Sequence, residues 1–289
     1  MLSATIRATA PAYEPESLKH LAVVMDVDGE AVRTLAQQLA GRLGAQVTAL
    51  CVVPPAPVGS LAQAEVRYDL VEAEARDQRS RAQAAAEAFD RALTEAGVVI
   101  DPRIVCREDA ECDAPLLDVA RLSDLILIQQ PEPGNARPSD AHLEEVLLQS
   151  GRPCLIVPYT GTAQVPFRNV TVAWDGSRSA ARTLGDALPF LRTAARVEVV
   201  EVATGFVPDG AARGARLIAH LEAHGVAACH RTLVSSLPFA QAILSHMADE
   251  GSDLLVMGAY GHSRLREALL GGASRDMLGC MTVPVLMAH

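Results

Sequence analysis

Runs of apolar, often β-branched residues alternate with longer amphipathic segments along most of this 289-residue chain. The first run, LAVVM at 21–25, is followed by a segment at 29–44 whose apolar residues recur at helical spacing. Continuous apolar runs are typical of strands that are buried on both faces of a sheet, and helices between them favour parallel pairing. The pattern therefore predicts βα units that build a parallel sheet covered by helices on both faces.

The beginning of this pattern occurs twice. Residues 21–35 read LAVVMDVDGEAVRTL, and residues 170–184 read VTVAWDGSRSAARTL. Placing Asp26 on Asp175 aligns Arg-Thr-Leu with Arg-Thr-Leu without a gap. Two later pairs of segments match in the same order: SDLILIQ (123–129) with SDLLVMG (252–258), and RPCLIVP (152–158) with VPVLMAH (283–289). Three ordered matches predict two homologous halves.

Each half is expected to contain five strands, which makes each a doubly wound five-stranded parallel-sheet α/β domain. The expected strands are 21–25, 46–53, 98–105, 124–128 and 152–158 in the first half, and 170–174, 196–203, 226–234, 253–257 and 283–289 in the second. The expected organisation is a lead-in at 1–17 without regular structure, a first domain at 18–158, a linker at 159–166 and a second domain at 167–289.

The two domains are expected to pack on each other as a pseudo-dimer. The terminal apolar strands at 152–158 and 283–289 each follow a proline and would lie at sheet edges, where an unpaired apolar strand is a liability. The sequence also leaves open a homodimer of two such chains. A charged, alanine-rich insertion at 65–97 predicts a long helix, which either covers the sheet with a solvated outer face or serves as a docking surface.

Composition narrows the class of protein. Hydrophobic residues make up 49% of the chain but aromatic residues only 3%, so Ala, Val and Leu must form the core. The formal net charge of −10 argues against nonspecific binding to nucleic acid or to anionic lipid. The six cysteines include no CxxC pair, which argues against a zinc site and a disulfide framework. No apolar run reaches the length of a membrane span and the N-terminus lacks an apolar signal region, so a cytoplasmic protein without membrane contact is expected.

Glycines gather directly after the apolar run DLLVM, in the stretch GAYGHSRLREALLGGASR at 258–275. Ligands of doubly wound sheets bind at the carboxyl ends of the strands, which is where Gly258 and Asp175 are expected. The pair Gly271 and Gly272 opens the last helix, and a helix N-terminus without side chains in the way suits a phosphate chain. Asp175 could accept a hydrogen bond from a ribose hydroxyl. Glycines after a strand are also compatible with no more than a tight turn.

These residues resemble the universal stress protein family, whose ATP-binding motif matches the spacing Gly258-x2-Gly261-x9-Gly271. The resemblance extends over 18–289 and implies a stress-response regulatory protein that binds ATP or ADP, with or without Mg, in the second half only. It implies the following site residues: Ala173, Trp174, Asp175, Val202, Met257, Gly258, Gly261, Gly271, Gly272, Ala273 and Ser274. The family usually has Ser or Thr where this chain has Gly272, so one hydroxyl, worth about 1 kcal/mol in an ordinary hydrogen bond, is lost.

The first half lacks the glycines. Gln129 occupies the place of Gly258, and the last helix is expected to begin at Ser139 and Asp140. We expect the carboxylates of Asp140, Glu144 and Glu145 to cap this helix and repel phosphate, while the prolines at 131, 133 and 138 stiffen the loop before it. The first half is therefore expected to be a partner domain without ATP.

No catalytic or metal-binding residue is predicted. Lys19 is the single lysine, which excludes the Walker motif GxxxxGK[ST]. His262 is either an exposed loop residue or a phosphate contact. Two functional hypotheses remain: a nucleotide-binding regulator with little or no hydrolysis, and a nucleotide-free scaffold that acts through protein contacts with an unknown partner. A third, an ATP-cleaving enzyme, is weaker because Asp175 is its only visible general base.

Overall fold

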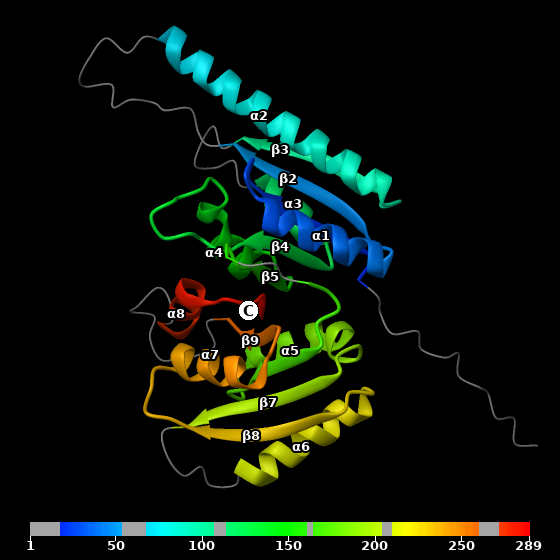
Figure 1. Cartoon of the computed structure of the whole chain (residues 1–289), viewed down its shortest axis with the longest axis vertical. Coiled ribbons are helices and arrows are strands. Elements are labelled where there is room, and N and C mark those ends of the chain that lie inside the picture. The colour runs from blue at the N-terminus through cyan, green and yellow to red at the C-terminus, as the bar shows by residue number, and fades with distance from the viewer. Residues whose placement is uncertain (1–17, 54–67, 107–113, 161–163, 204–209, 260–271) are drawn as a thin grey trace, which may run out of the picture.

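The computed structural model describes residues 18–53, 68–106, 114–160, 164–203, 210–259 and 272–289. Within these residues, ten strands form one sheet in the order β3-β2-β1-β4-β5-β10-β9-β6-β7-β8 (Figure 1). The strands are β1 (His20–Met25), β2 (Gln46–Val53), β3 (Ile100–Cys106), β4 (Leu125–Gln129), β5 (Cys154–Val157), β6 (Asn169–Ala173), β7 (Arg196–Ala203), β8 (Ala228–Val234), β9 (Leu254–Gly258) and β10 (Val285–Ala288). All pairs within each half are parallel, and both halves have the same strand order, so the predicted fold class is confirmed.

Helices cover both faces of this sheet. They are α1 (Glu30–Leu43), α2 (Tyr68–Glu95), α3 (Ala114–Leu122), α4 (Asp140–Gln149), α5 (Arg178–Leu191), α6 (Gly210–Ala223), α7 (Phe239–Glu250) and α8 (Gly272–Cys280). Helices α1, α2, α5 and α6 pack on one face, and α3, α4, α7 and α8 pack on the other. Successive strand residues alternate between the two cores: Leu21 and Val23 face one, and Ala22 and Val24 face the other. The alternation explains why these strands are apolar at every position.

The internal repeat is visible in equivalent hydrogen bonds. The Asp124 carboxylate accepts hydrogen bonds of 2.8 and 2.9 Å from the backbone N–H groups of residues 19 and 20, at the start of β1. Asp253 accepts bonds of 2.7 and 2.9 Å from residues 168 and 169, at the start of β6. The two aspartates occupy matching positions in the repeated segment SDL, so the sequence match corresponds to a structural match.

The two halves join through their terminal strands. Strands β5 and β10 are antiparallel, and Leu155 lies opposite Leu286. This pairing confirms the prediction drawn from the two apolar segments that follow a proline. It merges the two five-stranded sheets into one, so neither terminal strand leaves an open edge.

The long helix of the first half covers the outer end of the sheet (Figure 1). Helix α2 buries Ala82, Ala85, Phe89 and Leu93 in its C-terminal half, whereas residues 72–81 are mostly exposed. The covering role predicted for the insertion is therefore observed for this part of the helix. The predicted lead-in at 1–17 lies outside the described residues. Among the described helices, none combines the length and the apolar content that crossing a membrane would require.

Candidate functional site

The carboxyl ends of β6 and β7 place the first of the predicted site residues. Ala173 ends β6, and the N–H of Trp174 continues the ladder to β7 with a bond of 2.9 Å. The exposed Asp175 follows, and its Oδ1 accepts a bond of 2.9 Å from the N–H of Ser177. The Ser177 hydroxyl in turn accepts a bond from the N–H of Ala180 and caps α5. The turn that carries Asp175 is thus fixed by the start of α5.

Gly258 ends the neighbouring strand β9, and its lack of a side chain is required by packing. A Cβ atom there would lie 2.5 Å from the backbone nitrogen of Ala180 and 2.8 Å from the carbonyl carbon of Ser179. These distances are far below van der Waals contact, so only glycine lets the first turn of α5 approach the end of β9. The sequence suggested that position 258 is glycine because phosphates need access to the backbone. The structure supplies a second reason, the packing of α5 against β9, which involves no ligand.

Helix α8 begins with three small residues. Gly272 is exposed, and the nearest atom to a Cβ built on it would be Asp276 Oδ2 at 4.0 Å. Ala273 is half-buried and Ser274 is buried. The first N–H groups of a helix have no partner within the helix and carry a partial positive charge, so this end can attract an anion.

The structure brings most of the predicted site residues to one edge of the second half. Strands β7, β6, β9 and β10 are neighbours and run parallel, so the ends of β6, β7 and β9 and the start of α8 share that edge. Val202 is half-buried near the end of β7. Ala173 and Met257 are buried in the hydrophobic core, so they pack beneath the predicted site and do not line it. Gly261 and Gly271, with His262, lie outside the described residues.

In the first half, the corresponding aspartate is already engaged. Asp26 is 5% exposed, and its carboxylate accepts a 3.0 Å bond from the N–H of Ser139 and a second bond from the Ser139 hydroxyl. Burial raises the pKa of Asp26, although the bonds from Ser139 and the charge of Arg137 oppose this shift. The start of α4 thus binds the aspartate of its own half.

Arg137 fills the loop between β4 and α4. Its guanidinium donates to the Gln130 carbonyl and lies 3.3 Å from the Asp140 carboxylate, while its backbone N–H donates to Asp140 at 2.8 Å. Its side chain is only 10% exposed. Gln130 also donates a 2.7 Å bond to the carbonyl of Leu278 in α8, which ties this loop to the other half.

This arrangement corrects the reason that the sequence suggested for the closed first site. Glu144 and Glu145 lie in the second turn of α4, too far along to cap it. Ser139 occupies the N-cap position but makes no capping bond with its side chain. The first site is instead closed by Asp26 and Arg137, which the sequence analysis did not identify; the segment Arg-Pro-Ser-Asp at 137–140 is the sequence feature that could have indicated it.

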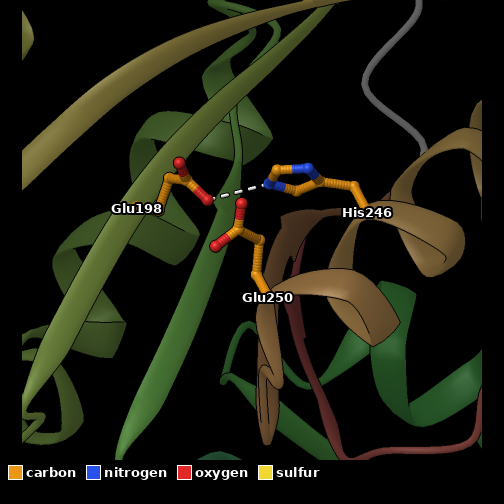
Figure 2. A group of neighbouring side chains, drawn as sticks. All are labelled: Glu198, His246 and Glu250. Atoms are coloured by element: carbon orange, nitrogen blue, oxygen red, sulfur yellow. Dashed lines mark hydrogen bonds and ion pairs between the residues drawn. The ribbon is translucent and has the colours of Figure 1, made fainter.

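A second cluster of charged side chains, not predicted from the sequence, lies between β7, β8 and α7 (Figure 2). Glu198 on β7 is 3% exposed, and its Oε2 lies 2.8 Å from Nε2 of His246. His246 and Glu250 are one helical turn apart on α7, and the three potential ligand atoms lie within 4.8 Å of one another. Glu, His and Glu side chains are ligands that a divalent metal would accept.

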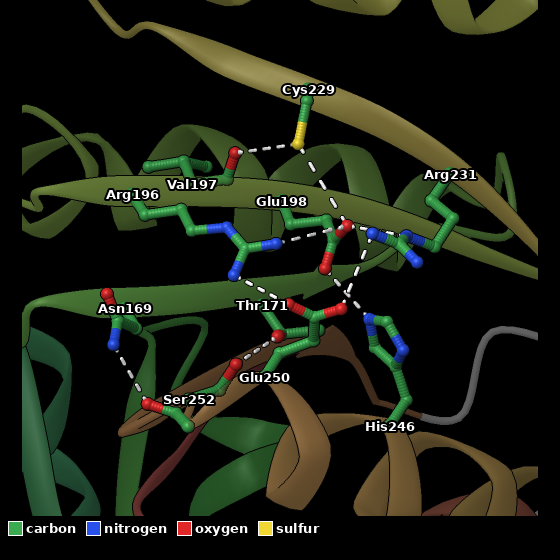
Figure 3. A network of polar contacts seen from close by, with 11 residues as sticks. Asn169, Thr171, Arg196, Val197, Glu198, Cys229, Arg231, His246, Glu250 and Ser252 are labelled. Carbon is green, nitrogen blue, oxygen red and sulfur yellow. Dashed lines mark hydrogen bonds and ion pairs between the residues drawn. The ribbon is translucent and has the colours of Figure 1, made fainter.

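The two arginines around this cluster favour a different interpretation (Figure 3). Arg231 Nε donates to Glu198 at 2.7 Å, and Arg196 donates to Glu250 at 2.6 Å. Each arginine also lies within 4 Å of the other carboxylate. Two guanidinium charges balance two carboxylate charges, so a metal ion would have to displace an arginine. We interpret the cluster as an ionic network that fixes α7 on the sheet.

This network belongs to the second half alone. The repeat aligns Glu198 with Thr48, and aligns His246 and Glu250 with Leu117 and Arg121. No local pattern in the sequence indicated the network, because its members are separated by up to 54 residues and meet only through the register of β7 and β8 and the packing of α7 on the sheet.

Known proteins match this chain at the level of family and fold. Residues 166–289 match the model of the universal stress protein family. A universal stress protein from Synechocystis sp. is 27% identical over 186 residues, which cover 63% of this chain and 60% of the length of that relative.

Solved structures agree with this match. The crystal structure of a universal stress protein from Archaeoglobus fulgidus covers 92% of this chain and 97% of its own length, with a TM-score of 0.65 and 16% identity. A protein of unknown function from Pseudomonas aeruginosa PAO1 covers 94% of this chain and 92% of its own length, with a TM-score of 0.56 and 15% identity. At such identities these structures show the fold alone. The second half of this chain therefore matches the universal stress protein family, and the first half repeats the fold of the second.

Proposed function

We propose that this protein binds an adenine nucleotide, ATP or ADP, at the carboxyl edge of its second half and acts as a regulator in a stress response. In this proposal Asp175 accepts a hydrogen bond from the ribose, with Trp174 and Val202 beside the nucleoside. The glycine-rich segment and the start of α8 receive the phosphates. The first half serves as a partner domain that binds no nucleotide.

The observation that supports the proposal most is the contrast between two equivalent edges. In the second half, Asp175 is exposed after β6, and α8 starts with an exposed glycine. In the first half, Asp26 is buried against the start of α4, and a guanidinium fills the loop. A single ligand site in a repeated fold requires such a difference: among the described residues, the aspartate is exposed in one copy and covered by the start of a helix in the other.

The assigned residues are suited to binding rather than to bond cleavage. Asp175 is the only titratable side chain among them, and the ribose engages it in this proposal. Activating water for attack on a phosphate would need a further general base. We therefore assign the signal to the bound or free state of the site, with little or no hydrolysis.

Replacing Asp175 with alanine is expected to weaken ADP and ATP binding by about 1.5–3 kcal/mol, roughly 10- to 150-fold, because a hydrogen bond to a charged acceptor is lost. Isothermal titration calorimetry measures this directly. Asp28→Ala is the matched control, since Asp28 is an exposed aspartate just after β1 in the closed half, and it should leave affinity unchanged. Equal affinities for wild type and Asp175→Ala would contradict the assignment of Asp175.

Replacing Gly272 with serine is expected to strengthen ATP binding more than ADP binding, on the order of 1 kcal/mol or about 5-fold, because it restores the hydroxyl common in the family. Among the described residues, no atom comes closer than 4.0 Å to a Cβ built on Gly272, so they leave room for the serine side chain. Gly279→Ser, near the far end of the same helix, is the control and should change neither affinity. An equal gain in both variants would show that the effect comes from helix stability instead.

A further inference from the structure

A cavity of about 580 Å³ lies between the two halves, away from the residues assigned to the nucleotide. One wall is α5, from Arg182 to Arg192 just beyond its end. The opposite wall comes from the first half, at Asp124 before β4 and at Arg152 and Pro153 before β5. Three arginines thus face one cavity in a protein whose net charge is −10.

Each of these arginines is held in place by a backbone carbonyl. The bonds join Arg152 Nε to Arg121 O at 2.9 Å, Arg192 Nε to His224 O at 2.9 Å, and the Arg182 guanidinium to Gly151 O. A guanidinium has five N–H donors, so one bond to the main chain orients the group and leaves further donors for an anion.

The carboxylates in the cavity wall only partly balance these charges. Asp124 is engaged by the backbone N–H groups of residues 19 and 20. Asp186 lies 3.5 Å from Arg182 Nε, and burial raises its pKa, while the charges of Arg182 and Arg152 oppose the shift. Three cationic groups therefore face two carboxylates, and the cavity retains a positive excess.

The second half contains a position equivalent to Arg152, and the residue at that position is uncharged. Pro153 and Pro284 both precede a terminal strand, and their carbonyls accept equivalent bonds from β4 and β9. This correspondence aligns Arg152 with Val283, which lines a separate cavity of about 440 Å³. The arginine at 152 is therefore not dictated by the repeated fold.

We propose that this cavity binds a small organic phosphate that carries a second anionic group. The phosphate lies between Arg152 of the first half and Arg182 of the second, where two oriented guanidinium groups supply paired donors. Arg192 lies about 15 Å further along α5 by the helical rise, and its long side chain receives the second anionic group. Leu188 and Pro189 lie between and contact the carbon skeleton. Such a ligand bridges the two halves and stabilises their packing.

Calorimetric titration of the whole chain at low salt tests this with three probes: inorganic phosphate, fructose 6-phosphate and fructose 1,6-bisphosphate. We expect fructose 1,6-bisphosphate to bind about 10-fold or more tightly than fructose 6-phosphate, since only the former has a second anionic group. Arg152→Gln and Arg182→Gln should each weaken both organic probes about 10-fold or more, whereas Arg192→Gln should remove only the advantage of fructose 1,6-bisphosphate. Arg91→Gln, at an exposed arginine on α2, is the control and should change nothing.

Circular dichroism melts of the same variants verify that they fold. The proposal is overturned if none of the probes binds at millimolar concentration, or if the Arg152 and Arg182 variants bind like wild type. Preference for inorganic phosphate over both esters would overturn the organic ligand. Loss of binding in Gly271→Val but not in Arg152→Gln would place the phosphate at the nucleotide site instead. Asp175→Ala should leave these affinities unchanged, so failure here is distinguishable from failure of the nucleotide proposal.

Discussion

Replacing Gly258 with alanine is expected to destabilise the protein by about 1–3 kcal/mol, and replacing it with valine by more, because the added carbon overpacks a filled contact. The Cβ atom would lie 2.5 Å from the Ala180 nitrogen and 2.8 Å from the Ser179 carbonyl carbon, which are backbone atoms that move only if α5 moves. A displaced α5 also shifts the turn that carries Asp175, so ADP affinity should fall together with stability. Urea denaturation and calorimetric titration measure the two effects.

Gly279→Ala is the matched control for this change. Gly279 lies in α8, and a Cβ built there meets no atom within 4 Å. Alanine should be neutral or stabilise the helix by up to about 1 kcal/mol. If Gly258→Ala were as stable as wild type, the close approach of β9 and α5 would be refuted.

Replacing Glu198 with alanine is expected to cost about 3 kcal/mol of folding free energy, at the lower end of the range for breaking a buried ion pair. The change leaves His246 buried without its carboxylate partner and removes one of the two negative charges from the network. The side chain of Arg231 is 49% exposed and can turn toward water, which limits the loss of folding free energy. The measurement is the free energy of unfolding in urea.

A control variant and a metal titration test whether this loss comes from the ionic network. Glu222→Ala, at an exposed position on α6, should change stability by no more than about 0.5 kcal/mol. Addition of EDTA or Zn²⁺ to wild type should leave the unfolding midpoint unchanged, because arginines already neutralise both carboxylates. A large stabilisation by Zn²⁺ that is absent from Glu198→Ala would instead favour a metal site.

The sequence predicted most of the fold because its signals are local. The runs QVTALCVV and RVEVVEVA contain no helix-favouring period or breaker, and the structure has β2 and β7 at these positions. Gly44, in the left-handed conformation with φ of 62°, caps the end of α1, which matches the end of the helical segment predicted at 29–44. The pairing of β5 with β10 was expected from the need to protect apolar edge strands, whereas its antiparallel direction is known only from the structure.

The candidate site was harder to predict from the sequence, because the contacts that define it join residues far apart in the chain. Asp26 and Ser139 are 113 positions apart, so the closure of the first half depends on how β1 and α4 meet. Gly258 shows a different difficulty, since a glycine that receives a phosphate and a glycine that admits a neighbouring helix look the same in a sequence. The assignments of Gly261 and Gly271 stay predictions.

The number of nucleotides bound per chain tests most directly whether this protein has one nucleotide site, in its second half. Native mass spectrometry of the whole chain with ATP or ADP counts bound nucleotides directly, with Gly271→Val as the variant that should block the phosphates, because a branched side chain would occupy their space. We predict one nucleotide per wild-type chain and none for Gly271→Val, with unchanged circular dichroism. Two nucleotides per chain, none in wild type, or one retained by Gly271→Val would contradict the account.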